Sequence, residues 1–110
     1  MNSQTSYIRI LHASPNAPAV DIYANGDLLV SNLSYKQLTK YLPVASGKYT
    51  VQVYPAGQRN TPVIETSLNV RPETAQTIAA EGLLPNIGLI SIPEVFMPHH
   101  HMHDMNKAYV

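Results

Sequence analysis

The chain has 110 residues, of which 45% are hydrophobic and 13% charged, and its seven basic residues balance seven acidic ones. This length and composition predict one globular domain that buries a core without covalent cross-links. Zero net charge argues against nucleic-acid or anionic-membrane partners, and it lowers the repulsion that opposes self-association. The sequence has no cysteine, which excludes disulfides, thiolate nucleophiles and cysteine-based metal sites.

The N-terminal segment MNSQTSYIRI has no basic stretch followed by a long apolar run, so we expect no secretory signal peptide. No stretch of the chain approaches the roughly 18 apolar residues of a membrane-spanning helix, so we expect no membrane span. We expect synthesis in the cytosol, with a surface location reached by assembly.

Strand signals follow one another along the chain, separated by turn signals roughly every 8–12 residues. Apolar and polar residues alternate with the period of two that is typical of half-buried strands. The expected strands cover residues 7–12, 20–24, 28–33, 41–44, 48–54, 63–70, 75–80 and 87–92. This spacing predicts an antiparallel β-sandwich of seven or eight strands. Alternation assigns to its core Ile8, Ile10, Val20, Ile22, Val51, Val53, Ile64, Leu68 and Leu89.

Two turns are specified by their residues. The segment from Ser14 to Pro18 contains two prolines three positions apart, which cannot lie in a central strand, so an ordered turn is predicted. Asn25-Gly26 predicts a tight hairpin, because a type I′ turn requires positive φ at both central residues.

His12, Ser14 and Asp21 are the residue types of a serine triad. A working triad needs a histidine that is hydrogen-bonded to both the serine and the carboxylate, beside an oxyanion hole. No strand–turn–helix elbow surrounds Ser14, so the structural interpretation is favoured. In it, Ser14 and Asn16 cap the turn through hydrogen bonds from their side chains to the backbone, His12 packs at the strand end and Asp21 anchors the turn. We expect no enzyme activity and no required cofactor.

The composition changes at Pro93, so we expect a β-sandwich domain over residues 1–93 and a tail, rich in histidine and methionine, over 94–110. The tail holds five candidate metal ligands, His99, His100, His101, His103 and Asp104. Alternate residues of an extended chain share a face, so three of these imidazoles could face one Zn²⁺, Ni²⁺ or Cu²⁺ ion. A solvated tail with incidental metal affinity is the alternative.

The tail is also apolar, and Val95, Phe96 and Tyr109 are candidate assembly residues. An open sandwich has edge strands with unpaired backbone groups, and the tail of one copy could pair with an edge of the next. Head-to-tail contacts of this kind build rings or filaments. A tail that is loose, as chain ends usually are, is the alternative.

Three segments together resemble a known family, and they read IRILHASPNAPAVDIYANGDLL, LPVASGKYTVQVYPAG and TPVIETSLNV. They are similar to the domain of unknown function 4397, whose members carry a similar His-Ala-Ser-Pro box. Asn16 stands where this family usually has aspartate. The resemblance covers residues 7–92 and implies an immunoglobulin-like β-sandwich. Members of this family are mostly bacterial, are often secreted and often carry tandem copies of the domain. It implies no activity.

We therefore expect a non-enzymatic structural or interaction module that self-assembles into a homo-oligomer or filament. A bacterial cell-surface layer or a spore coat would suit such a module. The alternative is a metal-binding protein that uses the histidine cluster of the tail.

Overall fold

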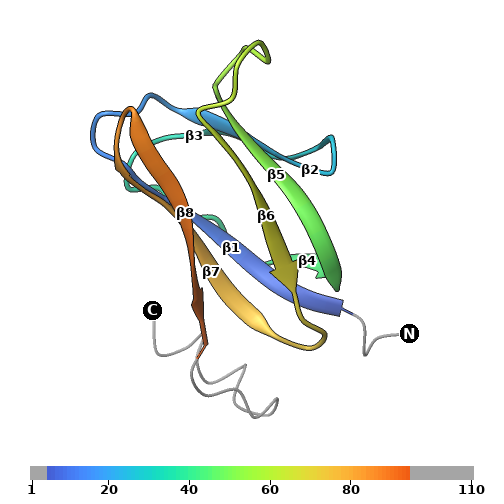
Figure 1. The fold of residues 1–110 in the computed structure, drawn as a ribbon. Helices are drawn as coiled ribbons and strands as arrows, with labels where there is room; N and C mark the ends of the chain where they lie inside the picture. The colour runs from blue at the N-terminus through green and yellow to red at the C-terminus, as the bar shows by residue number, and fades with distance from the viewer. Residues whose placement is uncertain (1–4, 95–110) are drawn as a thin grey trace.

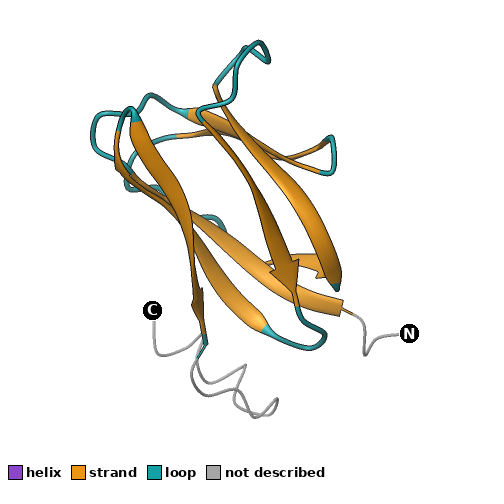
Figure 2. Cartoon of the chain, in the orientation of Figure 1, coloured by secondary structure: helices purple, strands orange, loops and turns teal. Residues whose placement is uncertain are grey.

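The computed structural model describes residues 5–94, in which eight β-strands form two four-stranded sheets (Figures 1 and 2). The strands are β1 (Thr5–Ala13), β2 (Val20–Ala24), β3 (Asp27–Leu33), β4 (Leu42–Ala45), β5 (Gly47–Pro55), β6 (Ile64–Val70), β7 (Ala75–Leu83) and β8 (Asn86–Pro93). Every predicted strand is present, and the predicted all-β sandwich is confirmed. No helix that could cross a membrane occurs in residues 5–94.

One sheet has the strand order β4-β1-β7-β8, and the other has the order β3-β2-β5-β6. We call them the β1 sheet and the β5 sheet. β1 and β7 are paired in parallel, from Tyr7 opposite Ala75 to Ala13 opposite Glu81, whereas the other strand pairs are antiparallel. The sequence did not predict the parallel pair, because the alternation of side chains has the same period in parallel and antiparallel strands.

The core lies between the two sheets, and seven of the nine predicted core residues are buried there. The other two, Leu68 and Leu89, are partly buried and pack against the core. Leu33, Val70, Ile78 and Ala80 complete it. Burying side chains of this size stabilises the fold by about 1.5–3 kcal/mol each, so the alternating strands account for most of the stabilisation by apolar burial.

The hairpin between β2 and β3 turns at Asn25-Gly26, where φ is 51° and 86°. Both angles are positive, as a type I′ turn requires. Asn25 also fixes the hairpin to β5, because its side-chain Oδ1 accepts a hydrogen bond from the Thr50 N–H at 2.8 Å, while its own N–H donates to the Thr50 carbonyl at 2.9 Å.

Candidate functional site

His12 lies at the end of β1, is 1% exposed and holds the proline turn through both ring nitrogens. Its Nδ1 accepts a hydrogen bond from the Ser14 N–H at 3.3 Å. Because Nδ1 is the acceptor, Nε2 carries the proton and donates to the Pro18 carbonyl at 2.8 Å. The Tyr35 ring packs against the imidazole in a T-shaped arrangement, with ring centroids 6.1 Å apart. The imidazole therefore closes the turn from inside.

Ser14 and Asn16 act differently from the capping role predicted for them. The backbone carbonyl of Ser14 accepts a hydrogen bond from the Ala17 N–H at 3.2 Å, but its buried Oγ has no hydrogen-bond partner among residues 5–94. The Asn16 side chain bonds to another loop, where its Oδ1 accepts from the Leu84 N–H at 2.9 Å and its Nδ2 donates to the Leu84 carbonyl at 3.4 Å. Asn16 thus ties the proline turn to the loop between β7 and β8.

Asp21 is 9% exposed and holds two other segments in place. Its Oδ1 accepts a hydrogen bond from the Asn32 N–H at 2.8 Å, and its Oδ2 accepts one from the Gly57 N–H at 2.9 Å. Both donors have positive φ, 55° at Asn32 and 88° at Gly57, which is strained for Asn32 but is readily adopted by glycine. Hydrogen bonds to a charged carboxylate are stronger than neutral ones.

Because of these contacts, the side chains of His12, Ser14 and Asp21 do not hydrogen-bond to one another. Each imidazole nitrogen is occupied by a backbone group, and the Asp21 carboxylate bonds to β3 and to the loop after β5. A triad requires the histidine to bridge the hydroxyl and the carboxylate, and that arrangement is not formed here. The segment from His12 to Asp21 therefore has a structural role at one end of the sandwich.

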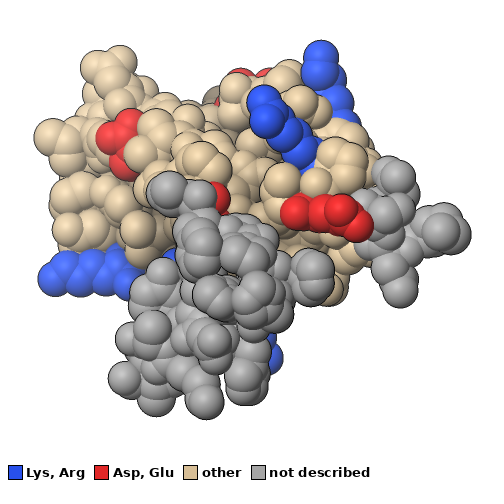
Figure 3. All heavy atoms as spheres, turned by 90° about the horizontal axis from the view of Figure 1, so that it is seen from below, with Lys and Arg blue, Asp and Glu red and all other residues tan. Residues whose placement is uncertain are grey.

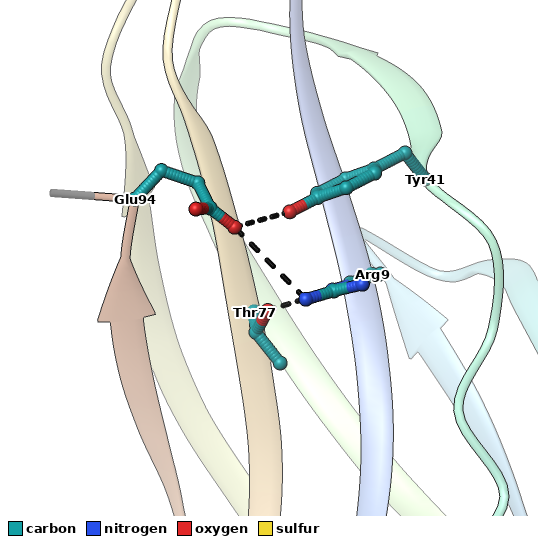
Figure 4. A network of polar contacts seen from close by, with 4 residues as sticks. All are labelled: Arg9, Tyr41, Thr77 and Glu94. Atoms are coloured by element: carbon teal, nitrogen blue, oxygen red, sulfur yellow. Dashed lines mark hydrogen bonds and ion pairs between the residues drawn. The ribbon is translucent and has the colours of Figure 1, made fainter. Parts of the chain in front are cut away.

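A second polar cluster, which no sequence motif predicts, lies on the outer face of the β1 sheet (Figure 4). The Arg9 guanidinium donates from Nε to Thr77 Oγ1 at 2.9 Å, and its centre lies 4.7 Å from the Tyr41 ring centroid. The Tyr41 hydroxyl donates to Glu94, whose carboxylate is also 4.0 Å from Arg9. Desolvation, followed by the bond to Glu94, raises the pKa of Tyr41 to about 12. The cluster fastens Glu94 to the sheet, one residue beyond the predicted domain boundary.

The same outer face is otherwise apolar. One row across the sheet reads Leu38, Leu11, Ala79, Ile90, and the next reads Tyr41, Arg9, Thr77, Ile92. We call the exposed large apolar residues of this face, Tyr7, Leu38, Ile90 and Ile92, the apolar face. On the outer face of the β5 sheet, the matching exposed residue is Leu28. Charged side chains of both signs are scattered over the surface visible in Figure 3, and neither sign forms a continuous patch there.

Between the sheets lies a cavity of about 20 Å³, lined by apolar side chains such as Ile10, Ile22 and Val51. This volume is close to that of a single water-sized probe, and the lining offers no polar group that would hold a water molecule. The cavity is a packing defect of the core and is too small for an organic ligand.

The remaining predicted site residues lie outside residues 5–94. They are the metal candidates His99, His100, His101, His103 and Asp104 and the assembly candidates Val95, Phe96 and Tyr109. Within the described range, no three histidine, aspartate or glutamate side chains are grouped so that they could hold a metal ion.

The structure thus defines a β-sandwich module in which the candidate triad is not assembled. A family model described as "Domain of unknown function (DUF4397)" matches residues 6–99, and the chain belongs to this family, as the sequence predicts. Among solved structures, the C-terminal domain of AlgF from P. aeruginosa has a similar fold, with a TM-score of 0.58 and 6% identity over 83% of this chain and 99% of that chain. At this identity the likeness concerns the fold alone. None of the curated proteins compared with the chain matches it significantly.

Proposed function

We propose that this protein is a non-enzymatic interaction module that associates with further copies of itself. The observation that carries the proposal is the apolar face. Of the seven large apolar side chains exposed among the described residues, four belong to this face. Exposed apolar side chains that gather on one face are typical of interaction surfaces, whereas scattered ones need no explanation.

The shape and charge of this face favour a second copy as the partner. Between Tyr7 on β1 and Ile90 on β8, the outer side of β7 carries only the small side chains of Ala75 and Ala79 at these two positions, and both are buried. Sheet faces of this kind pack closely on one another. The charges of Arg9 and Glu94 compensate each other within the face, and the whole chain is neutral, so two copies approach without net repulsion. Such a module suits an assembled layer at a bacterial cell or spore surface.

Size-exclusion chromatography with light scattering tests the proposal on the full chain over a range of concentrations. We expect a mass above that of the monomer which falls towards it on dilution. Ile92→Lys places a charge on the apolar face, where Ile92 is 49% exposed, and should weaken association. Leu28→Lys changes a residue that is 54% exposed on the β5 sheet and should leave association unchanged. A wild-type chain that is monomeric at every concentration would reject the proposal.

A second candidate function is metal binding by the tail. It is favoured by five potential ligands, His99, His100, His101, His103 and Asp104, within six positions of the sequence. Neutral imidazole is a good ligand for Zn²⁺, Ni²⁺ and Cu²⁺. Calorimetric titration of the full chain with each metal tests it, with a variant carrying serine at the four histidines as control. Binding that is equally tight in that variant would exclude the tail as the site.

A further inference from the structure

β8 is an edge strand of the β1 sheet. It pairs with β7 on one edge, and within residues 5–94 no strand pairs with its other edge. Its eight residues, NIGLISIP, carry no charge, and they contain no proline before the last position. Proteins usually protect an exposed edge with charges, prolines, bulges or shortness, because unpaired backbone groups recruit other strands. β8 has none of these protections along its first seven residues.

The other three edges of the sandwich are protected in one of these ways. β4 is four residues long and contains Pro43. β3 begins with the charged Asp27, and its register against β2 shifts twice. β6 carries Glu65 near its start. β8 is therefore the edge of the described domain that is best suited to accept another strand.

The backbone groups that β8 presents at this edge can be identified. Glu94 N–H donates to the Ala75 carbonyl at 3.1 Å, and these two residues continue the register of β8 against β7. In an antiparallel pair, hydrogen-bonded and non-hydrogen-bonded positions alternate. Counting back from Glu94, every second residue of β8 bonds to β7. Ile87, Leu89 and Ser91 therefore point their N–H and C=O groups towards the free edge.

We infer that β8 pairs with β8 of a second copy in antiparallel orientation, about a two-fold axis at Leu89. The inference deepens the proposed self-association and rests on it. The two four-stranded β1 sheets then form one continuous sheet of eight strands, and the apolar faces of both copies lie on the same side. A two-fold contact of this kind closes on itself and gives a dimer.

The axis at Leu89 follows from backbone pairing and from steric fit. It places Ile87 opposite the second copy's Ser91, so that all three outward-pointing residues of each strand find partners. An axis at Ser91 would instead bring Pro93, which has no N–H, into the ladder. With the axis at Leu89, Ile90 faces the second copy's Gly88, where a Cβ would meet nothing within 4 Å. Since β8 is uncharged, no residue of one β8 meets a like charge on β8 of the second copy.

Ser91→Pro tests the edge pairing, with Ser91→Ala as the matched control. Proline removes an N–H that points away from β7, and prolines are tolerated on edge strands. Both variants lose the hydroxyl that bonds to Gln76. We expect the dissociation constant of Ser91→Pro to rise at least about tenfold over that of Ser91→Ala, which is about 1.4 kcal/mol. Equal dissociation constants would reject the pairing.

Cysteine cross-linking tests the same pairing without the Ser91→Pro variant. The natural chain has no cysteine, so only the introduced cysteines can form a disulfide. Opposite residues in a non-hydrogen-bonded pair have Cα atoms about 4.5 Å apart, within the range for a disulfide. Gly88→Cys mixed with Ile90→Cys should cross-link at least about tenfold faster than either variant alone, by the same margin of about 1.4 kcal/mol. Equal rates, or no cross-link, would reject the axis at Leu89.

The outcomes separate the pairing from the proposed function. A wild-type chain that associates, is weakened by Ile92→Lys and is unaffected by Ser91→Pro rejects the pairing and keeps self-association through the apolar face. A wild-type chain that stays monomeric rejects both.

Discussion

The proline-turn end of the sandwich and its β8 edge differ in where their polar groups find partners. At the turn end, the buried His12 and Asp21 bond to backbone groups of the same chain, and Asn16 bonds to the neighbouring loop. At the edge, three successive outward-pointing residues of β8 present backbone groups that no strand in residues 5–94 pairs with. The first region is closed within one copy, whereas the second is open to another.

The part of the chain with the most recognisable sequence is therefore not the part that we propose as the interaction surface. The segment from His12 to Asp21, which is one part of the family resemblance, contains the residue types of a catalytic site but holds the end of the sandwich together. The edge strand has an ordinary sequence of apolar and small residues. Substitutions in the segment from His12 to Asp21 should lower the stability of the single domain, and substitutions in β8 should act on association.

His12→Ala should have the largest effect, a loss of about 3 kcal/mol in the free energy of unfolding. The change leaves a cavity at a site that is 1% exposed, and it removes a donor and an acceptor from the proline turn. Urea denaturation followed by circular dichroism measures it. Tyr35→Ala removes the ring that packs on the imidazole and should cost less than about 1 kcal/mol, because Tyr35 is exposed. A loss below about 1 kcal/mol for His12→Ala would contradict the conclusion that His12 holds the proline turn.

Asp21→Asn should cost about 2 kcal/mol while keeping the shape of the side chain. One carboxylate oxygen becomes an amide nitrogen, so one of the two backbone N–H donors, at Asn32 or Gly57, loses its acceptor. The same measurement applies, with Asp27→Asn as control at an exposed position of β3. Equal, small effects of the two substitutions would mean that Asp21 holds neither β3 nor the loop after β5.

Much of the fold could be predicted because its signals are local. Each strand shows its own alternation, and Asn25-Gly26 specifies its own turn. The pairing of β1 with β7 could not be predicted, because it joins residues 68 positions apart whose patterns fit many partners. Ala75 and Ala79 are buried although they lie on the outer side of β7, and no pattern within 75–80 indicates this.

The candidate site was predicted in composition and only partly in contacts. The spacing of Ile8, Ile10 and His12 puts the imidazole on the buried side of β1, so its interior position could be read from the sequence. Asn16 bonds to Leu84, 68 positions away, which local turn chemistry does not reveal. The cluster of Arg9, Tyr41 and Glu94 has no sequence motif either, because its members come together only when the β1 sheet forms.

Gly26→Val should cost about 1.5 kcal/mol, since a β-branched residue is strained at the φ of 86° found there. Gly88→Val is the matched control within β8. A Cβ at Gly88 meets nothing within 4 Å, and valine is favoured in strands, so its stability should change by less than about 0.5 kcal/mol. Both variants are measured at a concentration where the chain is monomeric. Two variants that melt together would show that the turn does not require positive φ.

Tyr41→Phe should cost about 1 kcal/mol at pH 7, because the hydroxyl donates to Glu94. The pKa of Tyr41 is raised from 10.0 to about 12 in the folded chain, so folding favours the protonated phenol. Its contribution to stability is complete below about pH 10 and is lost as the pH rises through about 12.

Denaturation curves between pH 8 and pH 12 check this dependence. Wild type should lose more stability over the upper part of this range than Tyr41→Phe does. Tyr7→Phe, which changes a tyrosine of the same outer face outside the cluster, should behave like wild type. An alkaline loss that is the same in Tyr41→Phe and wild type would assign it to other groups.

Deleting residues 95–110 should change the stability of the domain by less than about 0.5 kcal/mol. All eight strands, the core and the Glu94 contacts lie within residues 5–94, so the shortened chain keeps them. A deletion that also removes Glu94 would confuse the result, because Tyr41 would lose its acceptor. A loss above about 1 kcal/mol would show that the tail belongs to the folded domain.

The same deletion distinguishes two modes of association. If β8 pairs with β8, the shortened chain still forms a dimer, since the whole edge strand is present. If Val95, Phe96 and Tyr109 add the tail to a neighbouring copy, the shortened chain is monomeric. Serine at His99, His100, His101 and His103 in the full chain then isolates the contribution of metal, because loss of association in that variant alone assigns the contact to the imidazoles. A shortened chain that dimerises and is still disrupted by Ser91→Pro locates the contact at the open edge.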